Sequence, residues 1–294
     1  MTAKIIDGKQ IAAELRQELK QKVAALKERG IVPGLGVILV GDDPASHSYV
    51  TAKERACAEI GLHSDDNRLP VDVSQPELMA LIERMNADPK IHGILMQLPL
   101  PSQINEAEVL TKIAVDKDVD GFHPISVGRM VIGQKAFLPC TPHGVVQMLL
   151  RSGVTLEGAE VVIVGRSNIV GKPLANILMQ KSAMGNATVT VCHTRTKNIA
   201  QHTLRADIVI AAAGRPNTIT AEMVKPGAVV IDVGVNRIPD DTKKSGYRLV
   251  GDVDFDAVSQ KAAMITPVPG GVGPMTITML LYNTVESAAA LCPA

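Results

Sequence analysis

The segment Val161–Pro173 constrains the fold more than any other part of the chain, because it joins an apolar run to a glycine turn and then to a predicted helix. The β-branched run Val161–Val164 predicts a buried strand, Gly165 begins the turn, and Lys172-Pro173 is typical of a helix start. Such a helix start directs free N–H groups and a partial positive charge at an anionic ligand, commonly a dinucleotide. The segment is therefore a candidate nucleotide site.

The glycine spacing in this turn departs from two common phosphate-binding patterns. The Gly-x-Gly-x-x-Gly pattern is absent, because Ser167 replaces the middle glycine and Gly171 comes one residue late. A phosphate-loop NTPase is excluded, because Pro173 stands where a Ser or Thr would bind magnesium. An ordinary tight turn between strand and helix stays open as an alternative.

The next predicted strand, Thr188–Cys192, leads into His193–Lys197, which has no acidic residue. In an NAD site, a carboxylate roughly 20 residues past the glycines binds the ribose hydroxyls. Hydroxyls and cations occupy that place here and suit a 2′-phosphate, with Arg166 able to reach it from the first turn. A charge-assisted hydrogen bond contributes about 1.5–3 kcal/mol, so we predict a roughly ten- to hundredfold preference for NADP over NAD. A solvated basic loop is the alternative.

Composition limits the remaining possibilities. A chain of 294 residues with 46% hydrophobic content predicts two domains, each with its own core. Zero net charge, dispersed basic residues and 2% aromatic content argue against a nucleic-acid partner. The start of the chain lacks an apolar signal core, and prolines and glycines interrupt the long uncharged span 262–285, which argues against a membrane partner. The four cysteines form no zinc or disulfide pattern, so a cytoplasmic location is expected; they are Cys57, Cys140, Cys192 and Cys292.

Helix and strand patterns alternate along the chain, which predicts parallel sheets covered on both faces. An amphipathic helix should end at Gly30, another should span Ala45–Ile60, and Ser74 with Glu77 forms a capping box that opens a third. The predicted strands are Leu35–Val40, Ile91–Met96, Val161–Val164, Thr188–Cys192, Ile208–Ala212 and Val229–Val233. The predicted architecture is two α/β domains with a cleft between them, the second a Rossmann-like domain with a parallel sheet.

The first half of the chain contains the candidate catalytic side chains. Tyr49 and Lys53 lie four residues apart on a predicted helix and share a face, although such pairs are most often surface contacts. The Tyr-x-x-x-Lys pair of short-chain dehydrogenases follows their glycine turn, whereas this pair precedes it. The segment Asp116–Gly121 resembles the start of a calcium-binding EF-hand loop, but Val127 occupies the position of the essential Glu. The histidines do not cluster, so no metal site is predicted.

Taken in order, the motifs resemble the bifunctional methylenetetrahydrofolate dehydrogenase/cyclohydrolase family over nearly the whole chain. The motif Pro267–Thr276 alone is highly specific for this family, and the other motifs occur in the order that the family shows. The segments that carry the resemblance are Tyr49–Lys53 with Ile60-Gly61, Gly93–Pro101, Lys117–Phe122, Pro139–Pro142, Val164–Pro173, Asp232–Asn236, Val250–Val253 and Pro267–Thr276.

The resemblance implies a role for each matching residue. Lys53 would be the central acid–base group, Gln97 would hold it, Asp120 would bind the pterin ring and Tyr49 would lie against the folate. Substrate binding would also involve the residues that close the cleft where nicotinamide meets folate, namely Gly270, Gly271, Gly273 and Thr276. NADP would be bound by Gly165, Arg166, Ser167, Thr194 and Val235, to which we add Arg195 because of its charge.

The resemblance further implies a discontinuous folate-binding domain, residues 1–139 plus 270–294, and an NADP-binding domain, residues 140–269. The helix Met275–Cys292 would return to the first domain, and the protein would form a homodimer. The implied activity oxidises 5,10-methylenetetrahydrofolate and hydrolyses the product to 10-formyltetrahydrofolate, in one-carbon metabolism that supports purine and amino-acid biosynthesis. A monofunctional dehydrogenase and a non-catalytic NADP- or folate-sensing protein are the alternatives.

The chemistry of these reactions makes a demand on Lys53. Proton transfers in the hydrolysis need a group that loses and regains a proton near neutral pH. A free lysine has a pKa of about 10.4, and lowering it by about three units takes roughly 4 kcal/mol. Burial beside a cationic substrate could supply that energy, so Lys53 is expected to be buried.

Overall fold

The computed structural model describes residues 2–243 and 246–291, which form two compact units. Unit 1 comprises Met1–Ala12 and Thr141–Thr276, and unit 2 comprises Ala13–Cys140 and Ile277–Ala294. Two of the three boundaries fall inside long helices, α1 (Gly8–Glu28) and α10 (Val272–Leu291), so each of these helices contributes residues to both units. The third boundary follows Cys140, the first residue of α6 (Cys140–Arg151). No helix in the described part of the chain is both long enough and apolar enough to cross a membrane.

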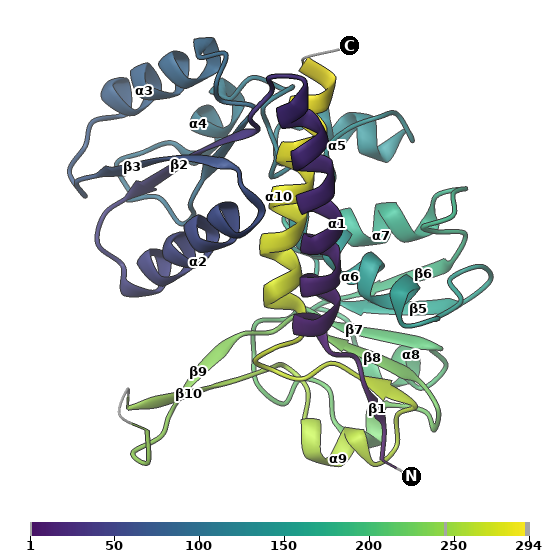
Figure 1. The fold of residues 1–294 in the computed structure, drawn as a ribbon. Coiled ribbons are helices and arrows are strands. Elements are labelled where there is room, and N and C mark those ends of the chain that lie inside the picture. The colour runs from purple at the N-terminus through teal and green to yellow at the C-terminus, as the bar shows by residue number, and fades with distance from the viewer. Residues whose placement is uncertain (1, 244–245, 292–294) are drawn as a thin grey trace. The chain divides into compact units, whose positions relative to one another are not determined.

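Unit 1 is built on a parallel sheet whose six described strands run in the order β1-β11-β8-β7-β5-β6 (Figure 1). The apolar β-branched runs of its central strands are buried on both faces, as is usual in parallel sheets. The predicted Rossmann-like parallel sheet is therefore confirmed. The strands are β1 (Lys4–Ile5), β5 (Glu160–Val164), β6 (Thr188–Cys192), β7 (Ile208–Ala211), β8 (Val229–Asp232) and β11 (Met264–Ile265).

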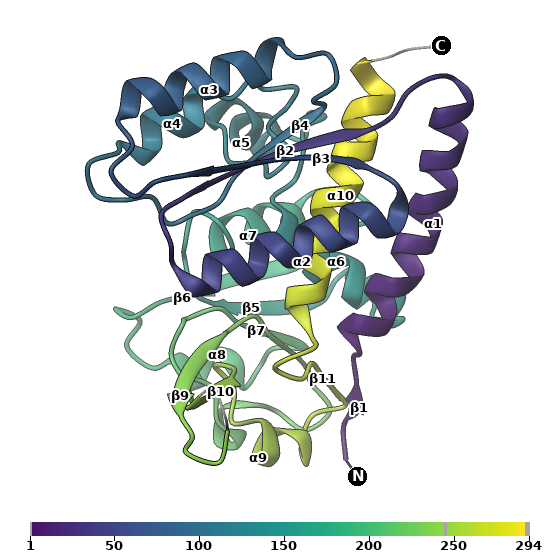
Figure 2. The ribbon, with the colours of Figure 1, turned by 60° about the vertical axis from the view of Figure 1, so that its left-hand side comes forward.

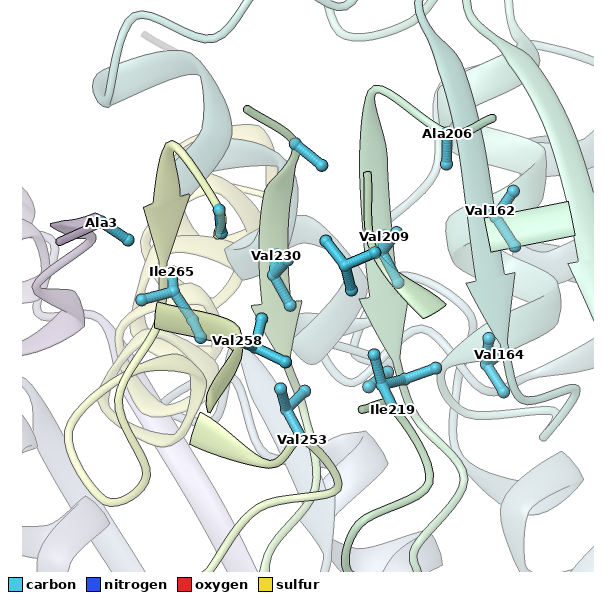
Figure 3. Packing of buried hydrophobic residues seen from close by; sticks show 14 of the residues in the cluster. Ala3, Val162, Val164, Ala206, Val209, Ile219, Val230, Val253, Val258 and Ile265 are labelled. Atoms are coloured by element: carbon cyan, nitrogen blue, oxygen red, sulfur yellow. The ribbon is translucent and has the colours of Figure 1, made fainter. Parts of the chain in front are cut away.

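Helices cover both faces of this sheet. Alternate strand residues, such as Val162, Val209 and Val230, form one core cluster with Val258 of α9 (Figure 3). The partly buried Ile199 of α8 packs against this cluster. Helices α6 and α7 lie on the opposite face (Figures 1 and 2). The remaining elements of unit 1 are α6 (Cys140–Arg151), α7 (Gly171–Met179), α8 (Ile199–Thr203), the short 3-10 helix η1 (Ala221–Met223), the antiparallel pair β9 (Asn236–Pro239) and β10 (Tyr247–Val250), and α9 (Phe255–Ser259).

Unit 2 contains a smaller parallel sheet in the order β3-β2-β4. Helix α2 covers one face, and α3 and α4 cover the other (Figure 2), where Leu78 and Ile82 of α3 pack with Ile38 of β2. The C-terminal part of α1 packs alongside α10, with Arg16 bonded to Thr278 and Lys22 to Glu286. The remaining elements are β2 (Gly34–Val40), α2 (Pro44–Ile60), β3 (His63–Leu69), α3 (Gln75–Ala87), β4 (Gly93–Met96), α4 (Glu106–Lys112) and α5 (Pro124–Val131).

Local sequence signals place several of these elements correctly. The capping box of Ser74 and Glu77 opens α3, and the four apolar residues predicted to share its inner face are buried. Asp43 caps α2, which ends at Gly61 in the left-handed conformation that glycine accommodates. These confirmed features depend only on neighbours in sequence.

Other boundaries differ from the prediction. Helix α6 begins at Cys140, so Thr141 lies within it and does not cap it; its hydroxyl contacts that of Thr276. Helix α10 begins at Val272 and not at Met275. Pro274 is tolerated in the first turn, because a backbone N–H at that position would have no partner within the helix. The end predicted at Cys292 lies outside the described residues.

The predicted domain boundaries also differ from the two units. Residues 1–12 belong to unit 1, because β1 pairs with β11 at the edge of the larger sheet. Residues 270–276 stay with unit 1 as well, where the Lys9 amide donates to Gly270. A Cβ on Gly8 would lie 1.8 Å from the carbonyl oxygen of Gly271, so the two segments are in direct contact.

Candidate functional site

Lys53 is a buried cation held by one side chain. It lies on α2, and only 8% of the residue is exposed. Its Nζ donates a hydrogen bond to Oε1 of Gln97 over 2.9 Å, and the Gln97 amide nitrogen donates to the carbonyl of Leu98 over 2.8 Å. The second bond orients the amide so that its oxygen faces the ammonium group. Because Lys53 is buried, Tyr49 and Lys53 do not form an ordinary contact on the protein surface.

The small sheet of unit 2 positions Gln97. This residue directly follows β4, and its backbone amide donates to Ile38 of β2 over 2.9 Å. The carboxyl ends of parallel strands meet at one edge of a sheet, where ligands of α/β proteins commonly bind. Gln97 therefore stands at the edge where such a site is expected.

A rigid loop positions Asp120. Its first residue, Lys117, accepts a backbone bond from Ile94 of β4, and its ammonium group donates to three carbonyl oxygens at the end of α3. Asp118 then accepts the backbone amides of Phe122 and His123. These bonds fix the loop on both sides of Asp120.

Lys53 and Asp120 interact electrostatically. Burial lowers the pKa of Lys53, and the negative charge of Asp120 opposes that change. Burial raises the pKa of Asp120, against the effects of the Lys53 charge and a hydrogen bond from the Cys140 thiol. Burial thus disfavours the charged form of each group, which brings the lysine closer to proton exchange at neutral pH.

Tyr49 lies one turn before Lys53 on α2 and remains 43% exposed, so its ring is available for contact with a ligand. The other predicted substrate residues belong to unit 1. Gly270 and Gly271 precede α10, whereas Gly273 and Thr276 lie in its first turns. Thr276 accepts or donates a 2.8 Å bond with Thr141.

The predicted nucleotide residues gather at the carboxyl edge of the sheet in unit 1. Gly165 follows β5, and a Cβ there would lie 2.1 Å from the Ala212 carbonyl oxygen beyond β7. A Cβ on Gly171, at the start of α7, would lie 2.2 Å from the Gly165 oxygen. The chain leaves β5 toward β6 on one side and returns to β7 on the other, and ligands bind at such a switch in strand order. Both glycines are thus required sterically.

The polar residues around this turn are exposed. Arg166 and Ser167 follow β5, and the Ser167 hydroxyl accepts the amide of Val170 before α7 begins. Thr194 and Arg195 follow β6, and both are exposed. Val235, which is 49% exposed, follows β8 at the same edge. The loop after β6 presents hydroxyl groups and cations, as the sequence predicted.

Comparison with known proteins identifies the family. The model of the tetrahydrofolate dehydrogenase/cyclohydrolase catalytic domain matches residues 6–120, and that of the family's NAD(P)-binding domain matches residues 139–292. The chain belongs to the tetrahydrofolate dehydrogenase/cyclohydrolase family. The bifunctional protein FolD of Dehalococcoides mccartyi is 58% identical, with 98% of this chain and 97% of the relative covered.

Solved structures of the family have the same fold. The bifunctional enzyme FolD from Campylobacter jejuni is 50% identical, with a TM-score of 0.92 and coverage of 98% and 99% of the two chains. The Trypanosoma brucei methylenetetrahydrofolate dehydrogenase-cyclohydrolase, solved in complex with NADP cofactor and inhibitor, is 41% identical, with a TM-score of 0.93 and coverage of 99% and 98%. The predicted family and the two-domain α/β fold are confirmed.

A pair of buried carboxylates in the NAD(P)-binding domain was not predicted. Asp232 accepts the amides of Gly234, Asp252 and Val253. Asp252 in turn accepts two amides of the loop after β7 and the side-chain amide of Asn236. The sequence signal was present, because both aspartates lie in segments that carried the family resemblance, but it assigned them no role. They tie together the loops beyond β7 and β8.

No group of three or more His, Cys, Asp or Glu side chains that could hold a metal occurs among the described residues. The three described cysteines, Cys57, Cys140 and Cys192, are free and buried.

Proposed function

We propose that this protein oxidises 5,10-methylenetetrahydrofolate to 5,10-methenyltetrahydrofolate with NADP and then hydrolyses the product to 10-formyltetrahydrofolate. The matches to both family domains and the near-full-length similarity to bifunctional relatives support this assignment. The structural observation that carries it is the buried Lys53 ammonium bonded to Gln97 and influenced by Asp120.

Lys53 is the acid–base group of the hydrolytic step. Water adds to the methenyl carbon, which is electrophilic because it shares the positive charge with its two nitrogens, and one proton must leave that water. A second proton transfer to the N5 nitrogen opens the ring, so one group must both accept and release a proton. Burial lowers the pKa of Lys53 toward the range where it can do both, and Gln97 holds the nitrogen in place.

Asp120 and Tyr49 bind the folate. A carboxylate at Asp120 accepts hydrogen bonds from the amino and ring N–H groups of a pterin. The exposed ring of Tyr49 offers an apolar face one helical turn from Lys53. We also assign Gly270, Gly271, Gly273 and Thr276 to substrate binding.

The nucleotide edge of unit 1 has the properties that NADP requires. The glycines after β5 let the backbone of this turn pack closely against its neighbours, and no carboxylate in His193–Lys197 would repel a 2′-phosphate. Gly165, Arg166, Ser167, Thr194, Arg195 and Val235 would hold the cofactor. When bound, NADP supplies the oxidant for the first step.

We also propose that the protein is a cytoplasmic homodimer that supplies one-carbon units for purine and amino-acid biosynthesis. The family resemblance supports the dimer, and the free buried cysteines agree with a reducing compartment. Sedimentation equilibrium tests the oligomeric state directly, since a monomer across the micromolar range would contradict it.

The substitution Lys53→Met tests the catalytic assignment. Arg55→Met is the matched control, because Arg55 is an exposed cation on the same helix. We expect Lys53→Met to lose enzyme-catalysed formation of 10-formyltetrahydrofolate while it remains folded and binds NADP, and Arg55→Met to retain the activity. Wild-type hydrolysis by folded Lys53→Met would refute the role of Lys53.

A further inference from the structure

Asn283 is a buried amide that joins two segments of unit 2. It lies on α10 and is 2% exposed. Its Nδ2 donates to the carbonyl oxygens of Val119 over 2.8 Å and Leu138 over 3.0 Å, and it lies 3.8 Å from Sγ of Cys140. One side chain therefore holds the residue before Asp120 and the segment that leads to Cys140.

These two segments are in close contact on the other side of Asp120 as well. Gly121 has a φ of +71°, and a Cβ there would lie 2.7 Å from the carbonyl oxygen of Phe137 and 2.8 Å from the nitrogen of Pro139. Asp120 is thus held between a residue bonded to Asn283 and a glycine pressed against the same neighbouring segment.

Cys140 completes the contact with Asp120. The Cys140 side chain is buried, and its Sγ lies 3.4 Å from the Val119 carbonyl oxygen. The thiol also lies close enough to the Asp120 carboxyl group to lower its pKa. Asn283 and Cys140 therefore both donate to the carbonyl of Val119, the residue directly before Asp120, and Asp120 interacts with Lys53 by charge.

We propose that Asn283 and Cys140 are positioning residues that hold the Asp120 carboxylate in the orientation needed to bind folate. The expected changes in kcat and KM rest on the proposed function. The proposal extends the site from the residues expected to touch substrate to a helix residue far away in sequence.

The charges around Asp120 give the direction of the expected effect. Lys53 faces it from α2, Cys140 faces it from the neighbouring segment, and Asp118 lies in its own loop. Replacing Cys140 by alanine removes the thiol that lowers the pKa of the Asp120 carboxyl group but leaves the other charges in place. The pKa of Asp120 should then rise, and a larger fraction of the enzyme should carry a neutral acid that accepts fewer hydrogen bonds from the substrate.

The test compares Cys140→Ala, Cys140→Ser and Asn283→Leu with a matched control, Thr284→Val. Thr284 is buried on the same helix, and its hydroxyl donates to Leu280 of that helix. Carbon-13 NMR of the Asp120 carboxyl group, assigned with Asp120→Asn, measures its titration in the unliganded protein. Steady-state kinetics give kcat and KM for 5,10-methylenetetrahydrofolate.

We expect Cys140→Ala and Asn283→Leu to raise the folate KM about tenfold with a smaller change in kcat, since one hydrogen bond to a charged group is affected. The Asp120 titration should move to higher pH in Cys140→Ala, and the serine variant should recover most of both effects. Thr284→Val should resemble wild type.

An unchanged Asp120 titration in Cys140→Ala, or equal effects of Asn283→Leu and Thr284→Val, would overturn the inference. Asn283→Ser, which cannot span both carbonyls, replaces the leucine variant if that protein does not fold. A wild-type enzyme without turnover would refute the proposed function, whereas the NMR titration would still decide the role of Cys140.

Discussion

Replacing Gly165 by alanine should destabilise the nucleotide-binding unit by much more than its backbone conformation alone explains. The new Cβ would lie 2.1 Å from the Ala212 oxygen and 2.7 Å from its carbonyl carbon, and φ at this position is +146°. The carbonyl belongs to backbone anchored to the sheet, because the Ala212 amide donates to Val164 of β5. The clash therefore cannot be relieved by a side-chain rotation.

The magnitude has two parts. A positive φ costs a residue with a Cβ about 1–2 kcal/mol. Forcing an extra carbon into a packed site adds about 1–3 kcal/mol. Gly158 is the matched control in the same unit, because it has a φ of +73° and a Cβ added there would have no neighbour within 4 Å. Gly158→Ala should therefore show only the first part.

Differential scanning calorimetry and NADP titration of both variants test this reasoning. We expect Gly165→Ala to unfold at a lower temperature than Gly158→Ala and to bind NADP at least about tenfold more weakly, since the shifted loop is the proposed phosphate site. Equal unfolding temperatures with unchanged NADP affinity would refute the close approach of the β5 and β7 loops.

Three further predictions concern other parts of the chain. Lys117→Met should lower the free energy of unfolding by about 2–4 kcal/mol in urea denaturation, because three carbonyl oxygens at the C-terminal end of α3 lose a buried charged donor. Lys135 is exposed, so Lys135→Met should change the free energy of unfolding little. Burial raises the pKa of Asp232 to about 6, above the value of about 3.9 in the unfolded chain. Protonation of Asp232 therefore stabilises the fold most at pH values below about 3.9, and this stabilisation is lost as the pH rises through about 6. The free energy of unfolding of wild type relative to Asp232→Asn should therefore increase by about 2–3 kcal/mol as the pH falls from about 7 to about 4. A difference that does not change with pH would contradict the shifted pKa. Arg166→Ala combined with Arg195→Ala should reduce the preference for NADP over NAD roughly ten- to hundredfold, and an unchanged ratio of the two kcat/KM values would refute the 2′-phosphate site.

The features predictable from sequence are those encoded locally. The Ser74–Glu77 capping box and the apolar runs of β5 and β7 need only neighbouring residues to be recognised. Strand β3 was missed, because the sequence of His63–Leu69 is largely polar. Its seven residues pair in register with β2, so backbone hydrogen bonds to a neighbouring strand define it.

The functional site also combines features that neighbouring residues encode with features that depend on distant parts of the chain. The spacing of Tyr49 and Lys53 placed both on one helix face but did not determine whether the lysine is buried. Its burial depends on Gln97, which arrives from the end of another strand, and its electrostatics depend on the Asp120 loop. The roles of Asn283 and Lys117 were not predictable for a similar reason, since their partners are backbone carbonyls brought near by tertiary structure.

A product assay on the purified wild-type protein tests the central claim most directly. The protein is incubated with 5,10-methylenetetrahydrofolate and either NADP or NAD, with and without a chelator, and methenyl- and 10-formyltetrahydrofolate are separated. We predict NADP-dependent, chelator-resistant formation of 10-formyltetrahydrofolate faster than spontaneous hydrolysis. Accumulation of the methenyl compound at the uncatalysed hydrolysis rate would instead indicate a dehydrogenase alone, and absence of turnover by folded protein would contradict the enzymatic assignment.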